Sequence, residues 1–201
     1  MSLTFYTNPQ SRGQIVRWML EEVGAPYEQV LLDYATTMKA PEYLAINPMG
    51  KVPAIRHGDV VVTEGAAICA YLADAFPGAG LAPPVSDRSD YYRWLFFAAG
   101  PVEAAITARS LGLEAPADKA AMAGYGQVDQ TIEMLAEAVT GRTYLAGDHF
   151  SAADVYVGSQ IDFGLMFKTF PDDPRFAAYV EGLRERPAYK RAKEIDMALM
   201  G

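Results

Sequence analysis

The sequence contains very little cysteine or histidine. Its 201 residues include one cysteine, Cys69, and two histidines, His57 and His149, far apart along the chain. A single thiol cannot form a disulfide within the chain, and isolated histidines lack the paired Cys and His spacing of a zinc site. The small apolar neighbours of Cys69 indicate that it packs in the core and is not a nucleophile.

The chain also lacks an excess of positive charge and any long apolar run. It carries 17 Lys and Arg against 25 Asp and Glu, a net charge of −8. Such a surface repels phosphate backbones and acidic lipids, so we expect no nucleic-acid or membrane partner. The apolar stretches at 68–76 and 94–102 are too short to span a bilayer, and the start MSLTFYT has no signal-peptide pattern. We expect a cytoplasmic protein, which the low cysteine content also favours.

What the sequence does contain is an alternation of strand and helix signals near the N-terminus. Residues 2–7 predict a short strand, Pro9–Arg12 predict a turn, and apolar residues then recur at helical spacing until Gly24. Residues 27–32 predict a second strand. A strand, a helix and a strand in this order form a parallel pair with a right-handed crossover.

The next segment predicts a second α/β unit. Residues 34–47 indicate only a short irregular helix. Strands are expected at 52–55 and 60–63, joined by the turn His57-Gly58-Asp59, and a helix at 64–76 follows. The expected order of this half is therefore βαβ followed by ββα.

The character of the sequence changes after this helix. Glycine and proline dominate the stretch that follows, and beyond residue 87 strand signals disappear while apolar residues recur at helical spacing. We expect an α/β domain, a linker and an all-helical domain, with the boundaries 1–78, 79–87 and 88–201.

Four segments in this order and spacing together resemble the cytosolic glutathione S-transferase superfamily, especially bacterial and fungal members with an N-P-x-S-R turn. The first is Tyr6–Gly13 followed by Ile15–Glu22, and the others are Asn47–Ile55, Glu64–Ile68 and Gly147–Asp154. The resemblance implies a thioredoxin-like glutathione-binding domain, followed by a helical bundle that contributes the electrophile pocket. It implies a homodimer, a small electrophile as second substrate, a detoxification chemistry, and no cofactor beyond glutathione. The apolar and aromatic stretch Tyr91–Gly100 is the candidate dimer surface.

The resemblance places the glutathione sulfur near the first turn. A helix N-terminus carries a partial positive charge, which stabilises a thiolate and lowers its pKa. A hydroxyl or amide that donates to the sulfur adds to this effect. Ser11 is the first candidate donor, Tyr6 the second and Asn8 the third, and Arg12 stabilises the thiolate by charge. Ser11 also suits a purely structural role as a helix cap.

The resemblance also assigns the residues that bind the rest of glutathione. Val52 precedes a cis Pro53 and pairs its backbone with the cysteinyl part of glutathione. Glu64 receives the γ-glutamyl ammonium. Gly65 stands where the family usually has a hydroxyl, so only its N–H is left for the γ-glutamyl carboxylate. Lys51 is the candidate for the glycyl carboxylate.

Two other functions fit the same residues. One is a glutathione-dependent reductase of disulfides or peroxides, which differs from a transferase only in the electrophile. The other is a non-catalytic module that binds glutathione or another protein. The pattern Ser151-Ala152-Ala153-Asp154 predicts a capping box that opens a helix, with a structural role.

Overall fold

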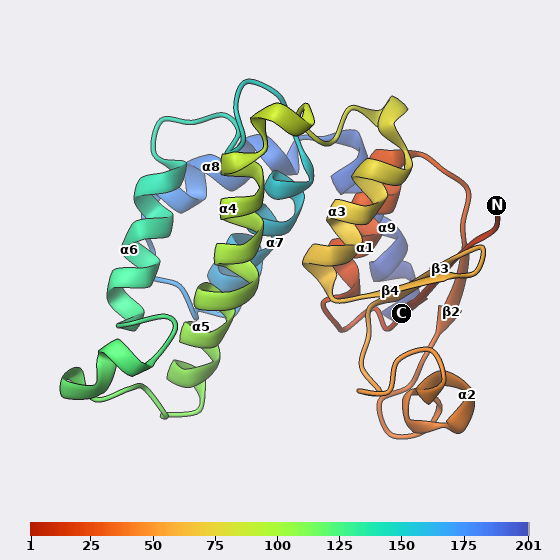
Figure 1. The fold of residues 1–201 in the computed structure, drawn as a ribbon, viewed down its shortest axis with the longest axis horizontal. Helices are drawn as coiled ribbons and strands as arrows, with labels where there is room; N and C mark the ends of the chain where they lie inside the picture. The colour runs from red at the N-terminus through yellow and green to blue at the C-terminus, as the bar shows by residue number, and fades with distance from the viewer. Residues whose placement is uncertain (201) are drawn as a thin grey trace. The chain divides into compact units, whose positions relative to one another are not determined.

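The computed structural model describes residues 1–200, and they form two compact units. The first comprises residues 1–81 together with the stretch from Arg186 onward, and the second comprises residues 82–185. The expected helical domain, 88–201, is therefore too long at its C-terminal end. The last helix belongs to the first unit because it packs along the first helix of the chain (Figure 1).

The first unit is built on a four-stranded mixed sheet with the strand order β2-β1-β3-β4. The strands are β1 (Leu3–Thr7), β2 (Glu28–Leu31), β3 (Ala54–His57) and β4 (Val60–Thr63). β1 and β2 are parallel, whereas β3 is antiparallel to both β1 and β4. The predicted βαβ and ββα arrangement is confirmed. β3 begins two residues later than expected, and Pro53 has no N–H to donate to a ladder.

The helices of this unit are α1 (Gly13–Val23), α2 (Pro41–Leu44), α3 (Gly65–Ala75) and α9 (Pro187–Met200). Figure 1 shows α1, α3 and α9 packed beside one another, with α2 on the other side of the strands. Successive side chains of β1 point to opposite faces of the sheet. Phe5 packs against Tyr27 and under the Arg17 guanidinium, whereas Tyr6 packs against Tyr43 of α2. Short 3₁₀ turns lie at Thr37–Lys39 and Pro77–Ala79.

The core of this unit holds the single cysteine. Cys69 lies on α3 with no exposed surface, and burial raises the pKa of its thiol. A thiol held in this way is neutral and does not act as a nucleophile. The predicted core role of Cys69 is confirmed.

Helix α9 carries a narrow buried stripe at helical spacing, formed by Ala188, Ala192 and Asp196. Asp196 accepts a hydrogen bond at 2.7 Å from Nε of Arg17 on α1, and both side chains are almost completely buried. Arg186, just before α9, forms a bidentate pair with Glu22 at 2.6 and 2.8 Å. These contacts attach the C-terminal helix to the unit.

The second unit is entirely helical, as the sequence predicts. Its helices are α4 (Ser89–Phe97), α5 (Glu103–Ser110), α6 (Val128–Val139), α7 (Ala152–Met166) and α8 (Pro174–Arg184). A π-helical segment, Ala98–Val102, joins α4 to α5, and short 3₁₀ turns lie at Val85–Asp87 and Ala117–Met122. Within residues 1–200, no helix is long and apolar enough to cross a membrane.

Helix α7 is buried on all sides and packs against α4 and α8. The predicted capping box is present at its start. Asp154 accepts from the N–H and the hydroxyl of Ser151, from the N–H of Leu145 at 2.7 Å and from the hydroxyl of Tyr179 at 2.7 Å. These bonds connect the start of α7 to the preceding loop and to α8.

Candidate functional site

The turn from β1 into α1 is unusually tight because of Gly13. A Cβ atom at this position would lie 2.1 Å from Oγ1 of Thr7 and 2.9 Å from Oγ of Ser11. A contact of 2.1 Å is impossible without a shift of the backbone or of Thr7. The absence of a side chain at Gly13 therefore allows the N-terminus of α1 to lie directly against the end of β1.

Asn8 fixes the base of this turn. Its side-chain Nδ2 donates to the carbonyl of Leu32 at 2.8 Å, just beyond β2, and its Oδ1 accepts from the N–H of Gln10 at 2.9 Å. The side chain thus ties the turn to the neighbouring strand. This observation favours a structural role for Asn8 in the turn.

Ser11 is held at the start of α1. Its hydroxyl donates to the carbonyl of Asn8 at 2.6 Å and accepts from the N–H of Gly13 at 2.9 Å. The side chain is half-buried, and Arg12 follows it at the N-cap position. Rotation about the Cβ–Oγ bond redirects the hydroxyl proton, so Oγ can donate to a group placed at the helix N-terminus while keeping the bond from Gly13.

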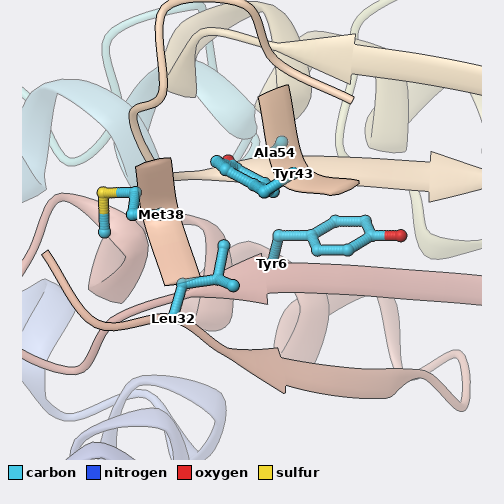
Figure 2. Close-up of a cluster of buried hydrophobic side chains, with 5 residues drawn as sticks. All are labelled: Tyr6, Leu32, Met38, Tyr43 and Ala54. Atoms are coloured by element: carbon cyan, nitrogen blue, oxygen red, sulfur yellow. The ribbon is translucent and has the colours of Figure 1, made fainter. Parts of the chain in front are cut away.

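Tyr6 lies elsewhere. Its ring belongs to a buried cluster with Leu32, Met38, Tyr43 and Ala54 on the α2 side of the sheet. Figure 2 shows the Tyr6 hydroxyl directed away from Leu32 and Met38, and away from the arrowhead of β1. The structure therefore brings Asn8, Ser11 and Arg12 together in the turn, whereas the Tyr6 side chain packs in this cluster.

The loop before β3 is anchored by side chains that the sequence analysis did not single out. The hydroxyl of Tyr43 and Nδ2 of Asn47 donate to the carbonyl of Lys51 at 2.6 and 2.8 Å. Nζ of Lys39 donates to the carbonyl of Gly50 at 2.6 Å. Burial raises the pKa of Tyr43 to about 12, so its hydroxyl stays protonated at neutral pH and continues to donate.

This anchored loop leads directly into Val52, which is half-buried. The Val52–Pro53 bond is cis, as the resemblance implied. No backbone hydrogen bond to another described residue uses the N–H or the carbonyl of Val52. Both groups are therefore available to an extended ligand. The Lys51 side chain beside them is exposed.

Glu64 and Gly65 form the start of α3. Glu64 has φ 68° and ψ 121°, a left-handed backbone that non-glycine residues rarely adopt. Strain of this kind costs about 1–3 kcal/mol and clusters at functional sites. Glu64 is the N-cap residue, with an exposed side chain, and Gly65 is the first residue of the helix. The first N–H groups of α3 have no partner within the helix and suit an anion.

The first unit thus combines two helix N-termini, near Ser11 and at Gly65, with an N–H and a carbonyl at Val52 that no backbone hydrogen bond to another described residue uses. Comparison with known proteins identifies the family. Residues 1–74 match the model of the glutathione S-transferase N-terminal domain, and residues 97–187 match that of the C-terminal domain. The chain belongs to the glutathione S-transferase family.

Individual relatives cover most of the chain. Glutathione S-transferase 1 of Zea mays is 30% identical over an alignment of 184 residues that covers 86% of this chain and 86% of its own. A solved glutathione transferase of Methylococcus capsulatus superposes with a TM-score of 0.80 at 27% identity, covering 98% of this chain and 99% of its own. A sphingomonad glutathione S-transferase in complex with glutathione superposes with a TM-score of 0.78 at 29% identity, covering 96% and 98%.

Proposed function

We propose that the protein is a glutathione transferase that binds glutathione at Ser11, Val52 and Glu64 and directs its thiolate at a small electrophile. The observation that carries this proposal is the placement of the Ser11 hydroxyl at the N-terminus of α1, 2.9 Å from the N–H of Gly13. Family membership and the glutathione bound to the sphingomonad relative support it.

The proposed catalytic effect is thiolate stabilisation. A free thiol has a pKa near 8.5 and is mostly protonated at neutral pH. The positive end of α1, the Ser11 hydroxyl and the charge of Arg12 all favour the thiolate over the thiol. A pKa lowered by about two units corresponds to about 2.7 kcal/mol and makes the thiolate the main form at pH 7. The thiolate then attacks the electrophile directly, without a further cofactor.

Each part of glutathione has a proposed partner. The cysteinyl backbone pairs with the N–H and carbonyl of Val52, and the glycyl carboxylate pairs with Lys51. Glu64 accepts the γ-glutamyl ammonium, and the N–H of Gly65 donates to the γ-glutamyl carboxylate. A serine or threonine at position 65 would add one hydrogen bond, worth about 1 kcal/mol, so glycine there weakens binding.

The test is a pH titration of glutathione thiolate absorbance in the presence of the protein. We expect a bound thiol with a pKa well below the free value, and a higher pKa in Ser11→Ala than in the wild type. Tyr6→Phe and Asn8→Ala serve as comparison variants, because the structure places Tyr6 in the buried cluster and Asn8 at the base of the turn.

The outcomes separate the candidate functions. Binding with an unshifted thiol would indicate a glutathione-binding module without catalysis, and absence of binding would refute the proposal. If the thiol of Ser11→Ala ionises as in the wild type while that of Tyr6→Phe does not, Tyr6 is the donor. Assays with an aryl halide and with a peroxide distinguish conjugation from reduction.

We also propose a homodimer that uses helix α4. Tyr92 and Phe96 on this helix are 42% and 71% exposed, and their rings lie 6.4 Å apart. Exposed aromatic residues of this kind are enriched at protein interfaces. Sedimentation should give a dimeric mass that Phe96→Glu shifts towards the monomer; a monomeric wild type would refute this proposal.

A further inference from the structure

The C-terminal helix reaches the Ser11 turn through two hydrogen bonds. Nζ of Lys193 on α9 donates to Oε1 of Gln14 at 3.0 Å. Nε2 of Gln14 donates to the carbonyl of Pro9 at 2.7 Å. Residues 179 positions apart in the sequence are thus joined, and the Pro9 carbonyl lies two residues before Ser11.

The chemistry of these groups fixes the orientation of the Gln14 amide. An ammonium group only donates and a backbone carbonyl only accepts. The amide satisfies both neighbours only when its oxygen faces Lys193 and its nitrogen faces Pro9. Lys193 therefore does more than add a contact, because it selects the orientation in which Gln14 holds the turn.

Both residues are themselves restrained. Gln14 is half-buried in the first turn of α1, and Nζ of Lys193 lies 5.4 Å from the centre of the Tyr189 ring. That ring packs edge-on against Trp18 of α1 at 5.0 Å. The connection to the turn thus starts from a well-packed part of the interface between α9 and α1.

We propose that Gln14 and Lys193 are positioning residues of the active site. They hold the Pro9 carbonyl and thereby keep the Ser11 hydroxyl at the N-terminus of α1, where it meets the glutathione sulfur. This inference rests on the proposed function. Neither residue needs to touch glutathione, so their loss affects ionisation of the thiol and kcat more than the KM for glutathione.

The variants Gln14→Leu and Lys193→Met test this role, since each removes the polar group and keeps most of the apolar volume. We expect kcat to fall about five- to tenfold, in line with the loss of one hydrogen bond, and the pKa of the bound thiol to rise. Lys193→Arg keeps a donor and should retain activity close to that of the wild type.

Arg191→Met is the matched control. Arg191 lies on the same helix and also joins α9 to α1, through the carboxylate and the carbonyl of Glu21 at 3.3 and 3.2 Å, but these bonds do not involve the turn. We expect an unchanged thiol pKa and kcat. Urea unfolding of all four variants shows whether each remains folded under the assay conditions.

The failure of this inference is distinguishable from failure of the proposed function. A wild type that does not lower the pKa of bound glutathione refutes the function itself. If the wild type lowers it and both Gln14→Leu and Lys193→Met do the same with an unchanged kcat, the positioning role is refuted. An equal loss of activity in Arg191→Met, or a loss that only follows the unfolded fraction, refutes it too.

Discussion

Replacing Asp196 by alanine leaves the Arg17 guanidinium buried without its counter-charge. The two side chains are 1% and 2% exposed, so water cannot solvate the remaining charge without local unfolding. Arg17 keeps one hydrogen bond, from Nη1 to the hydroxyl of Tyr27 at 3.1 Å. That hydroxyl is itself a donor to Glu21 at 2.9 Å and carries no full charge.

The expected loss of folding free energy in Asp196→Ala follows from this burial. Removing one partner of a buried ion pair costs about 3–5 kcal/mol, because the other charge stays desolvated. For a chain of this length, each 1 kcal/mol lowers Tm by about 2–4 °C, which gives a decrease of roughly 6–20 °C. Replacing both partners together, as Arg17→Met with Asp196→Leu, removes the unpaired charge and should restore stability close to that of the wild type.

The assay is urea unfolding followed by tryptophan fluorescence. The chain has two tryptophans, Trp18 on α1 in the first unit and Trp94 on α4 in the second, so a Trp94→Phe background reports only on the first unit. Arg191→Ala breaks a more exposed ion pair on the same helix and should cost no more than about 1 kcal/mol.

Two results would refute the reasoning. One is an Asp196→Ala variant no less stable than Arg191→Ala, since the buried charge would then not determine the cost. The other is a double variant as unstable as the single one, because the loss would then come from packing of α9 and not from an unpaired Arg17.

Further expected outcomes concern other parts of the chain. Asp154→Ala leaves the buried donors around it without an acceptor and should lower the free energy of unfolding by about 3 kcal/mol or more, measured by urea unfolding. Gly13→Ala should cost about 1–3 kcal/mol and weaken glutathione binding in calorimetry, because the new Cβ displaces the turn. Gly65→Ser should tighten glutathione binding about fivefold, corresponding to one added hydrogen bond; a weaker or unchanged Kd would contradict the proposed γ-glutamyl site. Hydrogen bonds from Arg175 hold the pKa of Asp173 below its usual value near 3.9, so this pair stabilises the fold above about pH 4 and the contribution is lost as the pH falls. Comparing urea midpoints of the wild type and Arg175→Met at neutral pH and at about pH 3 checks this, and a difference that grows on acidification would contradict it.

The elements of the sheet and most helices could be predicted because their signals are local. β4 has the expected bounds, and Gly24, with φ 70°, ends α1 as its position implied. Helix α7 has no amphipathic pattern, because it is buried all round, but the capping box at Ser151 marks its start.

Helix α9 is different because its buried stripe is two alanines and one aspartate. Such residues give no hydrophobic period, and the reason for burying Asp196 is an arginine 179 positions earlier. No local pattern assigns this helix to the first unit.

In the candidate site, too, local sequence patterns predict only part of the structure. The segments that carry it are recognisable as motifs, and the cis bond before Pro53 was expected from them. The side chains that hold these segments in place, Tyr43, Asn47 and Gln14, were not found, because their role lies in hydrogen bonds to backbone carbonyls. Asn47 before Pro48 indicated only the end of a helix. The positive φ of Glu64 likewise could not be predicted, because glutamate has no preference for this backbone conformation.

The attachment of α9 to α1 has a consequence for synthesis on the ribosome. Arg17 is made 179 residues before Asp196, which at about 5–20 residues per second is an interval of roughly 10 to 35 seconds. Throughout this time, in the nascent first unit, the Arg17 guanidinium lacks the Asp196 carboxylate and the Trp18 ring lacks its contact with Tyr189. The second unit is translated completely within the same interval. The fourteen residues of α9, which are translated after the whole second unit, therefore complete a unit whose other residues were made before it.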